Sequence, residues 1–80
     1  MVETKFYILF SYHTERMRME NILKKQGIKY TIVQTPSELS ETFVTSIVYN
    51  KKDEGRIKIL LEMNSINIGG MIRLSKDRDY

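Results

Sequence analysis

The chain has 80 residues and a formal net charge of +3, from 13 basic and 10 acidic residues, and it contains no cysteine. This length allows one domain with one small hydrophobic core. Without cysteine, the chain cannot form disulfides, iron–sulfur clusters, cysteine–zinc sites or a thiol nucleophile. Its single histidine, His13, cannot build a multi-histidine metal site, and no carboxylate cluster has ligand spacing. We therefore expect no metal and no cofactor.

The first predicted element is a β-strand over residues 5–10. Side chains alternate between the two faces of a strand, so Phe6 and Ile8 share one face. Tyr7 and Leu9 share the other face. A strand that is apolar on both faces is typical of the centre of a sheet, or of a strand whose second face meets a partner.

A helix is predicted next, over residues 12–26, with Ser11 as its N-cap and Gly27 at its end. Met19 and Leu23 recur at helical spacing and would face the core.

The remaining chain predicts three further strands and a second helix. Both middle strands are rich in β-branched and aromatic residues, Asp53 would cap the second helix, and two glycines form a turn before the last strand. In chain order these elements are a strand over 28–34, a loop over 35–41 that contains the only proline, a strand over 43–49, a helix over 54–64 and a strand over 71–74.

The resulting order, β-α-β-β-α-β, predicts a ferredoxin-like α+β sandwich of two layers. In this fold a four-stranded antiparallel sheet carries both helices on one face, and the first and third strands are central. We expect a single domain over residues 1–80, with an ordered core over about 4–75 and a charged C-terminal tail over 76–80.

The sheet face opposite the helices would be uncovered, and it would expose apolar side chains. Such patches often mark interfaces, so we expect a homodimer or a protein partner. Methionines suit adaptable contact surfaces. The predicted interface residues are Tyr7 and Leu9 on the open face, and Met17, Ile59 and Met63 on the outer sides of the helices.

Three segments of the chain resemble a known family. They are residues 13–23 (HTERMRMENIL), the Gly-Ile pair at 27–28 and the loop over 35–40 (TPSELS). Together they resemble the selenium/sulfur carrier-like family of small bacterial proteins, over about residues 5–74. The resemblance implies the scaffold of that family, and a carrier that holds sulfur or selenium on a cysteine.

The carrier position of this family is replaced in this chain. In the family pattern a Pro-Arg-Glu-Ile-Ser loop precedes a Cys-Gly pair. Pro36 and residues 38–40 fit this loop, but Ser37 stands where the family has arginine, and Phe43 and Val44 stand where it has cysteine and glycine. A carrier needs a thiolate. The resemblance therefore implies a retained scaffold without its reactive group.

The candidate ligand-binding residues lie at the start of the first helix and in the following loop. His13, beside a helix N-terminus, could act as a base or contact an anion. Alternatively, His13 packs on the surface and the loop side chains only solvate and brace a turn. These candidates are His13, Pro36, Ser37, Glu38, Ser40 and Phe43.

From these residues we expect a non-enzymatic binding or interaction protein of the cytoplasm, with neither a membrane nor a nucleic acid as partner. Residues 6–10 form an apolar run that is too short for a signal peptide or a membrane span. Two alternatives stay open. One is a small-ligand or enzymatic site at the helix start and the 35–41 loop. The other is nucleic-acid binding through the open sheet face, although the aromatic signature of such domains is missing.

Overall fold

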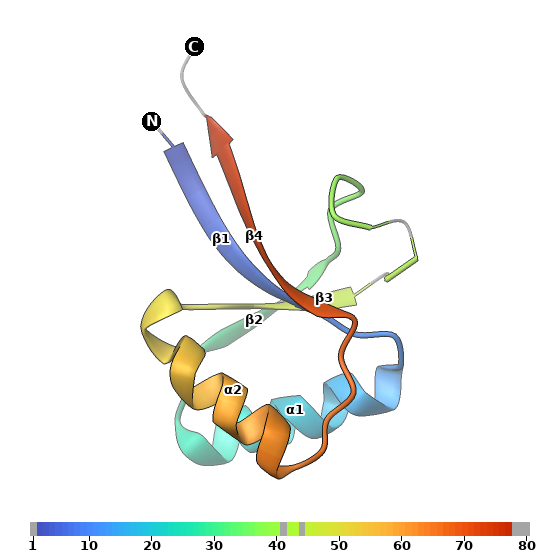
Figure 1. Ribbon diagram of the computed structural model, residues 1–80, viewed down its shortest axis with the longest axis vertical. Helices are drawn as coiled ribbons and strands as arrows, with labels where there is room; N and C mark the ends of the chain where they lie inside the picture. The colour runs from blue at the N-terminus through green and yellow to red at the C-terminus, as the bar shows by residue number, and fades with distance from the viewer. Residues whose placement is uncertain (1, 41, 44, 78–80) are drawn as a thin grey trace.

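The computed structural model describes residues 2–40, 42–43 and 45–77. The element order confirms the predicted β-α-β-β-α-β arrangement (Figure 1). The elements are β1 (Val2–Leu9), α1 (His13–Gln26), β2 (Tyr30–Gln34), β3 (Thr45–Tyr49), a 3₁₀ turn (Lys51–Asp53), α2 (Glu54–Met63) and β4 (Gly70–Asp77).

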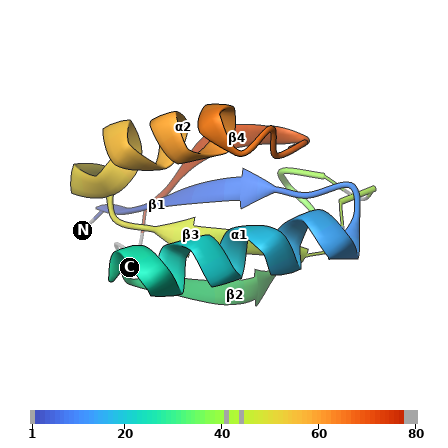
Figure 2. The same ribbon diagram turned by 90° about the horizontal axis from the view of Figure 1, so that it is seen from below.

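The four strands form one sheet in the order β2-β3-β1-β4, and every neighbouring pair is antiparallel. β1 and β3 are central, as predicted. Both helices lie on the same face of the sheet, which Figure 2 shows from the helix side. The chain therefore has the α+β ferredoxin-like architecture that the sequence pattern predicts.

The main core lies between the sheet and the helices. Ile8 of β1 and Ile47 of β3 are direct cross-strand partners, and both are fully buried. Met19 and Leu23 of α1 and Ile57 of α2 are fully buried in the same cluster. The core face predicted for the first helix from its apolar spacing is therefore confirmed.

The helix caps differ in part from the prediction. α1 begins at His13, and Tyr12 occupies its N-cap position with an extended backbone, so the prediction of Ser11 as N-cap is wrong. Asp53 occupies the N-cap position of α2, as predicted, but neither Tyr12 nor Asp53 caps its helix with a side-chain hydrogen bond. Gly27 ends α1 as predicted, because its φ of 68° is left-handed and its N–H bonds to two carbonyls of the last turn.

The last strand is longer than predicted. β4 pairs with β1 along its whole length, from Val2 opposite Asp77 to Leu9 opposite Gly70. Every residue of β1 has a partner in β4, so strand pairing continues beyond the predicted end at residue 74. It includes residues 76 and 77, which the sequence predicts to be part of a charged tail. Residues 78–80 of that predicted tail lie outside the described residues.

The sheet face away from the helices is partly covered, so the expectation that Tyr7 and Leu9 are exposed there is wrong. Tyr7 is 5% exposed and Leu9 is 2% exposed. The connection between β2 and β3 rises on this side of the sheet (Figure 1). There the hydroxyl of Thr35 hydrogen-bonds to the hydroxyl of Ser46, which is fully buried beside Leu9 in the strand register.

A tyrosine–glutamate pair joins β3 to α2. The Tyr49 hydroxyl donates to a Glu54 carboxylate oxygen at 3.0 Å, and the tyrosine is 4% exposed. Burial raises the pKa of Tyr49 well above its ordinary value, and the hydrogen bond to Glu54 and the negative charge of that carboxylate raise it further.

This raised pKa predicts a loss of stability at alkaline pH. The folded state holds the phenolic proton more tightly than the unfolded state, in which the pKa is about 10. The contribution of the Tyr49 proton to the free energy of unfolding is therefore fully present below about pH 10. It is lost as the pH rises towards the pKa of Tyr49 in the folded state. Urea unfolding at about pH 8 and about pH 11 should show this loss. The Tyr49→Phe variant should show a smaller loss, and an equal loss in both proteins would contradict the prediction.

Candidate functional site

A small pocket lies where β1 ends, α1 begins and β3 starts. Its volume is about 160 Å³. Its described lining residues are Phe10, Ser11, Tyr12, His13, Arg16, Thr42 and Thr45. The pocket therefore combines one cationic side chain, one imidazole and three aliphatic hydroxyl groups with the first turn of a helix.

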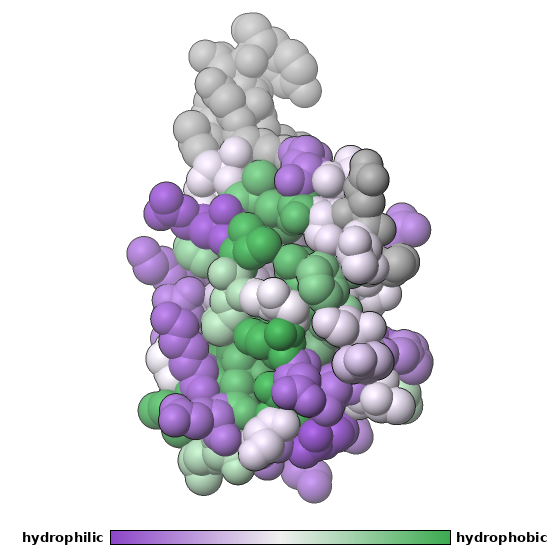
Figure 3. Space-filling model, turned by 45° about the vertical axis from the view of Figure 1, so that its right-hand side comes forward, coloured by the Kyte–Doolittle hydropathy of each residue, from purple (hydrophilic) through white to green (hydrophobic). Residues whose placement is uncertain are grey.

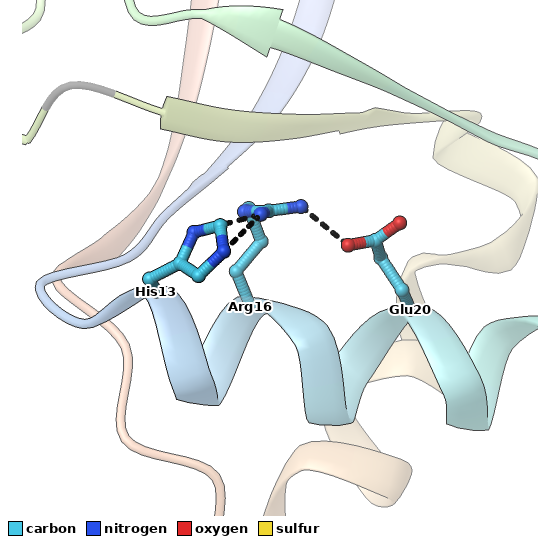
Figure 4. Close-up of polar contacts among 3 residues, drawn as sticks. All are labelled: His13, Arg16 and Glu20. Carbon is cyan, nitrogen blue, oxygen red and sulfur yellow. Dashed lines mark hydrogen bonds and ion pairs between the residues drawn. The ribbon is translucent and has the colours of Figure 1, made fainter.

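Arg16 is the central charge of this pocket, and its side chain is only 11% exposed. One guanidinium nitrogen forms an ion pair with Glu20, as the four-residue spacing predicts, and another lies 2.8 Å from Nδ1 of His13 (Figure 4). Its Nε is buried without a hydrogen-bond partner among the described residues. Because a guanidinium can only donate, Nδ1 of His13 must accept in this arrangement.

The start of α1 adds backbone donors to the pocket. No side chain caps this helix end, and the Tyr12 side chain is exposed. The first N–H groups of a helix lack intrahelical partners and carry a partial positive charge. Since the described lining holds no carboxylate, and Glu20 is already paired with Arg16, the pocket is suited to a small anion.

The structure brings only one of the predicted ligand residues into this described lining, namely His13. Ser40 instead braces the loop, because its hydroxyl accepts the backbone N–H groups of Thr42 and Phe43 at 3.0 and 3.1 Å. The carbonyl of Pro36 accepts two N–H groups of the same turn. Ser37 and Glu38 are exposed. The structure therefore gives Pro36 and Ser40 turn-forming contacts.

Phe43 packs this loop against Gly69, the residue before β4. Its ring is half-buried against Gly69, where an added Cβ would lie 2.6 Å from Cε1 of the ring. The Gly69 N–H donates to the Leu9 carbonyl at 2.6 Å, which places this contact at the end of β1. Phe43 thus has a packing role in this chain.

The residues predicted to form an interface do not share one surface property. Met17, Ile59 and Met63 are 49%, 57% and 74% exposed, whereas Tyr7 and Leu9 are buried. Turning the right-hand side of Figure 1 forward brings a band of apolar side chains with hydrophilic flanks into view (Figure 3). The dimer stays a prediction from the sequence.

Sequence reasoning did not name six of the seven described lining residues as site residues, among them Arg16, Thr42 and Thr45. The spacing signal for Arg16 was present, since it lies three residues after His13 and four before Glu20. That spacing places all three side chains on one side of the helix. Thr42 and Thr45 carry no such signal, because a loop of no regular period brings them to the helix start.

Comparison with known proteins settles the family. Residues 5–73 match the family described as "Putative Se/S carrier protein-like". The chain belongs to this family. No curated protein and no solved structure matches it significantly.

This Se/S carrier-like protein differs from a thiol carrier in its chemistry. Its 80 residues contain no cysteine, so no thiolate of this chain can hold sulfur or selenium as a persulfide-type adduct. Within the described residues, neither helix has the length and apolar character needed to cross a membrane.

Proposed function

We propose that this Se/S carrier-like protein is a non-enzymatic binding protein that holds a small anion non-covalently in the pocket at the start of α1. The observation that carries the proposal is the side chain of Arg16, which Glu20 and His13 hold in the pocket wall. Hydroxyl groups and the helix N-terminus supply further donors around it. Oxyanions of sulfur or selenium, such as sulfite and selenite, are the probes that the family name suggests.

The contacts of His13 favour binding over catalysis. A catalytic histidine activates a nucleophile within hydrogen-bond reach. Among the described residues, the hydrogen bonds of His13 go to Arg16 alone, at 2.8 and 3.3 Å. The Ser40 hydroxyl accepts two backbone N–H groups within its own loop. These contacts support a role for His13 in positioning the guanidinium.

Two substitutions of one ion pair should change anion binding in opposite directions. Arg16→Gln removes the cation and should weaken selenite or sulfite binding about tenfold or more, since a hydrogen bond to a charged group contributes about 1.5–3 kcal/mol. Glu20→Gln frees the guanidinium from its carboxylate partner and should strengthen binding. The affinity of each variant is measured from backbone amide shifts in an NMR titration. In the wild-type protein these shifts should centre on residues 11–16, 42 and 45.

A charge-matched control separates the site from general electrostatics. Arg56→Gln removes one positive charge from α2, where the guanidinium donates to the Gln26 carbonyl at 3.4 Å. It should leave the affinity within about twofold. Equal affinities in Arg16→Gln and wild type would contradict the proposed site. A stable mass increase of wild type after treatment with a persulfide donor would contradict non-covalent binding.

A further inference from the structure

A second and larger pocket lies at the other end of α1, where that helix ends, β2 begins and β3 ends. Its volume is about 590 Å³, within the range of pockets that bind small molecules. Its lining includes Lys24, Lys29, Tyr30, Tyr49 and Asn50. This lining contains two lysines and two tyrosines but no acidic residue.

The charges around this pocket are uncompensated. Within the described residues, Lys24 and Lys29 form no ion pair. Lys51, which follows the lining residue Asn50, lies 5.9 Å from the centre of the Phe6 ring. Glu54 is bonded to the Tyr49 hydroxyl and paired with a lysine of its own helix. The lining therefore attracts an anion. The anion can bind the lysines without displacing an acidic side chain.

The negative end of the α1 dipole faces this region, but the carbonyls of Leu23, Lys24 and Gln26 in its last turn already accept hydrogen bonds. The N–H groups of Gly27 and Ile28 bond to carbonyls of the last turn, and Arg56 donates to the carbonyl of Gln26. Engaged carbonyls repel an anion less than free ones. Lys24 thus remains available to a bound ligand.

The tyrosines give the pocket a second chemical character. Tyr30 is half-buried on the edge strand β2, directly opposite Tyr49 in the strand register. Aromatic faces stack planar rings, and lysines bind phosphate groups as point charges. The two features lie in one pocket, so a ligand that uses both must join a ring to a phosphate.

We propose that this pocket binds a small phosphorylated compound with a planar ring, which is the chemistry of a mononucleotide. Lys24 and Lys29 contact the phosphate, and Tyr30 stacks on the ring. This site is distinct from the anion pocket, because Lys24 lies eleven residues along the helix from His13, roughly 16 Å at 1.5 Å per residue. The proposal therefore does not depend on the proposed function.

The test is an NMR titration of the full chain with adenosine diphosphate, and with adenosine and pyrophosphate as its separate halves. Adenosine diphosphate should shift the amides of residues 24–31 and 48–50 and leave those of residues 13–16 in place. Lys24→Gln/Lys29→Gln should weaken its binding at least about tenfold. Tyr30→Leu should weaken the binding of adenosine diphosphate several-fold and leave the binding of pyrophosphate unchanged.

The control removes the same charge elsewhere. Arg18→Gln/Arg73→Gln lowers the net charge equally, on α1, where Arg18 bonds to Glu15 and to the Asn64 carbonyl, and on β4 at the opposite edge of the sheet. It should retain the wild-type affinity. An equal loss of nucleotide affinity in this control would mean that net charge alone causes the effect of the lysine substitutions, and it would overturn the proposal. No shift at millimolar nucleotide, or pyrophosphate binding as tightly as the nucleotide, would also overturn it.

Discussion

The Ile47→Ala variant is expected to lose about 2–5 kcal/mol of the free energy of unfolding. Ile47 is fully buried on the central strand β3 and pairs with Ile8 on one side and Ile32 on the other. Truncation removes transfer free energy and leaves a cavity that strands on both sides prevent from collapsing. A domain of this size has a total stability of roughly 4–12 kcal/mol, so the loss is a large fraction of the total.

Urea unfolding followed by circular dichroism measures this loss. The matched control is Ile59→Ala, which makes the same truncation on α2 at a side chain that is 57% exposed. It should change stability by less than about 1 kcal/mol. If the two variants lost the same free energy, Ile47 would not have the central packing role described above.

The second large effect is expected at Gly69. Its φ lies outside the left-handed region, so the backbone itself accepts alanine, but the new Cβ would lie 2.6 Å from the Phe43 ring. Contacts this short do not persist, and the ring must leave its place on Gly69. Gly69→Ala should therefore cost about 1–3 kcal/mol, comparable to the burial of part of a large side chain.

A double-mutant cycle isolates the cause. In a Phe43→Ala background the ring is absent, and Gly69→Ala should become nearly neutral. Gly55→Ala is the control, because this helical glycine has open space around its Cα, and alanine there should stabilise the protein by about 0.5–1 kcal/mol. An undiminished cost of Gly69→Ala without Phe43 would show that the ring is not the obstacle.

The fold was predictable because its signals are local. The apolar run over residues 6–10 predicts β1, helical spacing of Met19 and Leu23 predicts α1, and Gly27 predicts its end. The length of β4 was not predictable from residues 75–77 alone. Their strand conformation depends on pairing with the first residues of the chain, more than sixty positions away.

The candidate site was predictable only in part. His13 lines the pocket at the start of α1, but Arg16, which carries the charge, was not among the candidate residues. The loop residues predicted beside His13 were chosen from their residue types alone. Serine and glutamate fit a binding loop and a solvated turn equally well, and the contacts of Ser40 with two backbone N–H groups show the second use.

By itself, the sequence determined the element order, the family resemblance over most of the chain and the absence of a thiol. These follow from residue spacing and residue identity, which need no three-dimensional information. Only the tertiary structure decided what covers the open sheet face, which residues surround Arg16 and where the Phe43 ring lies. Each of these depends on contacts between distant segments, because a loop without periodicity is placed by what it packs against.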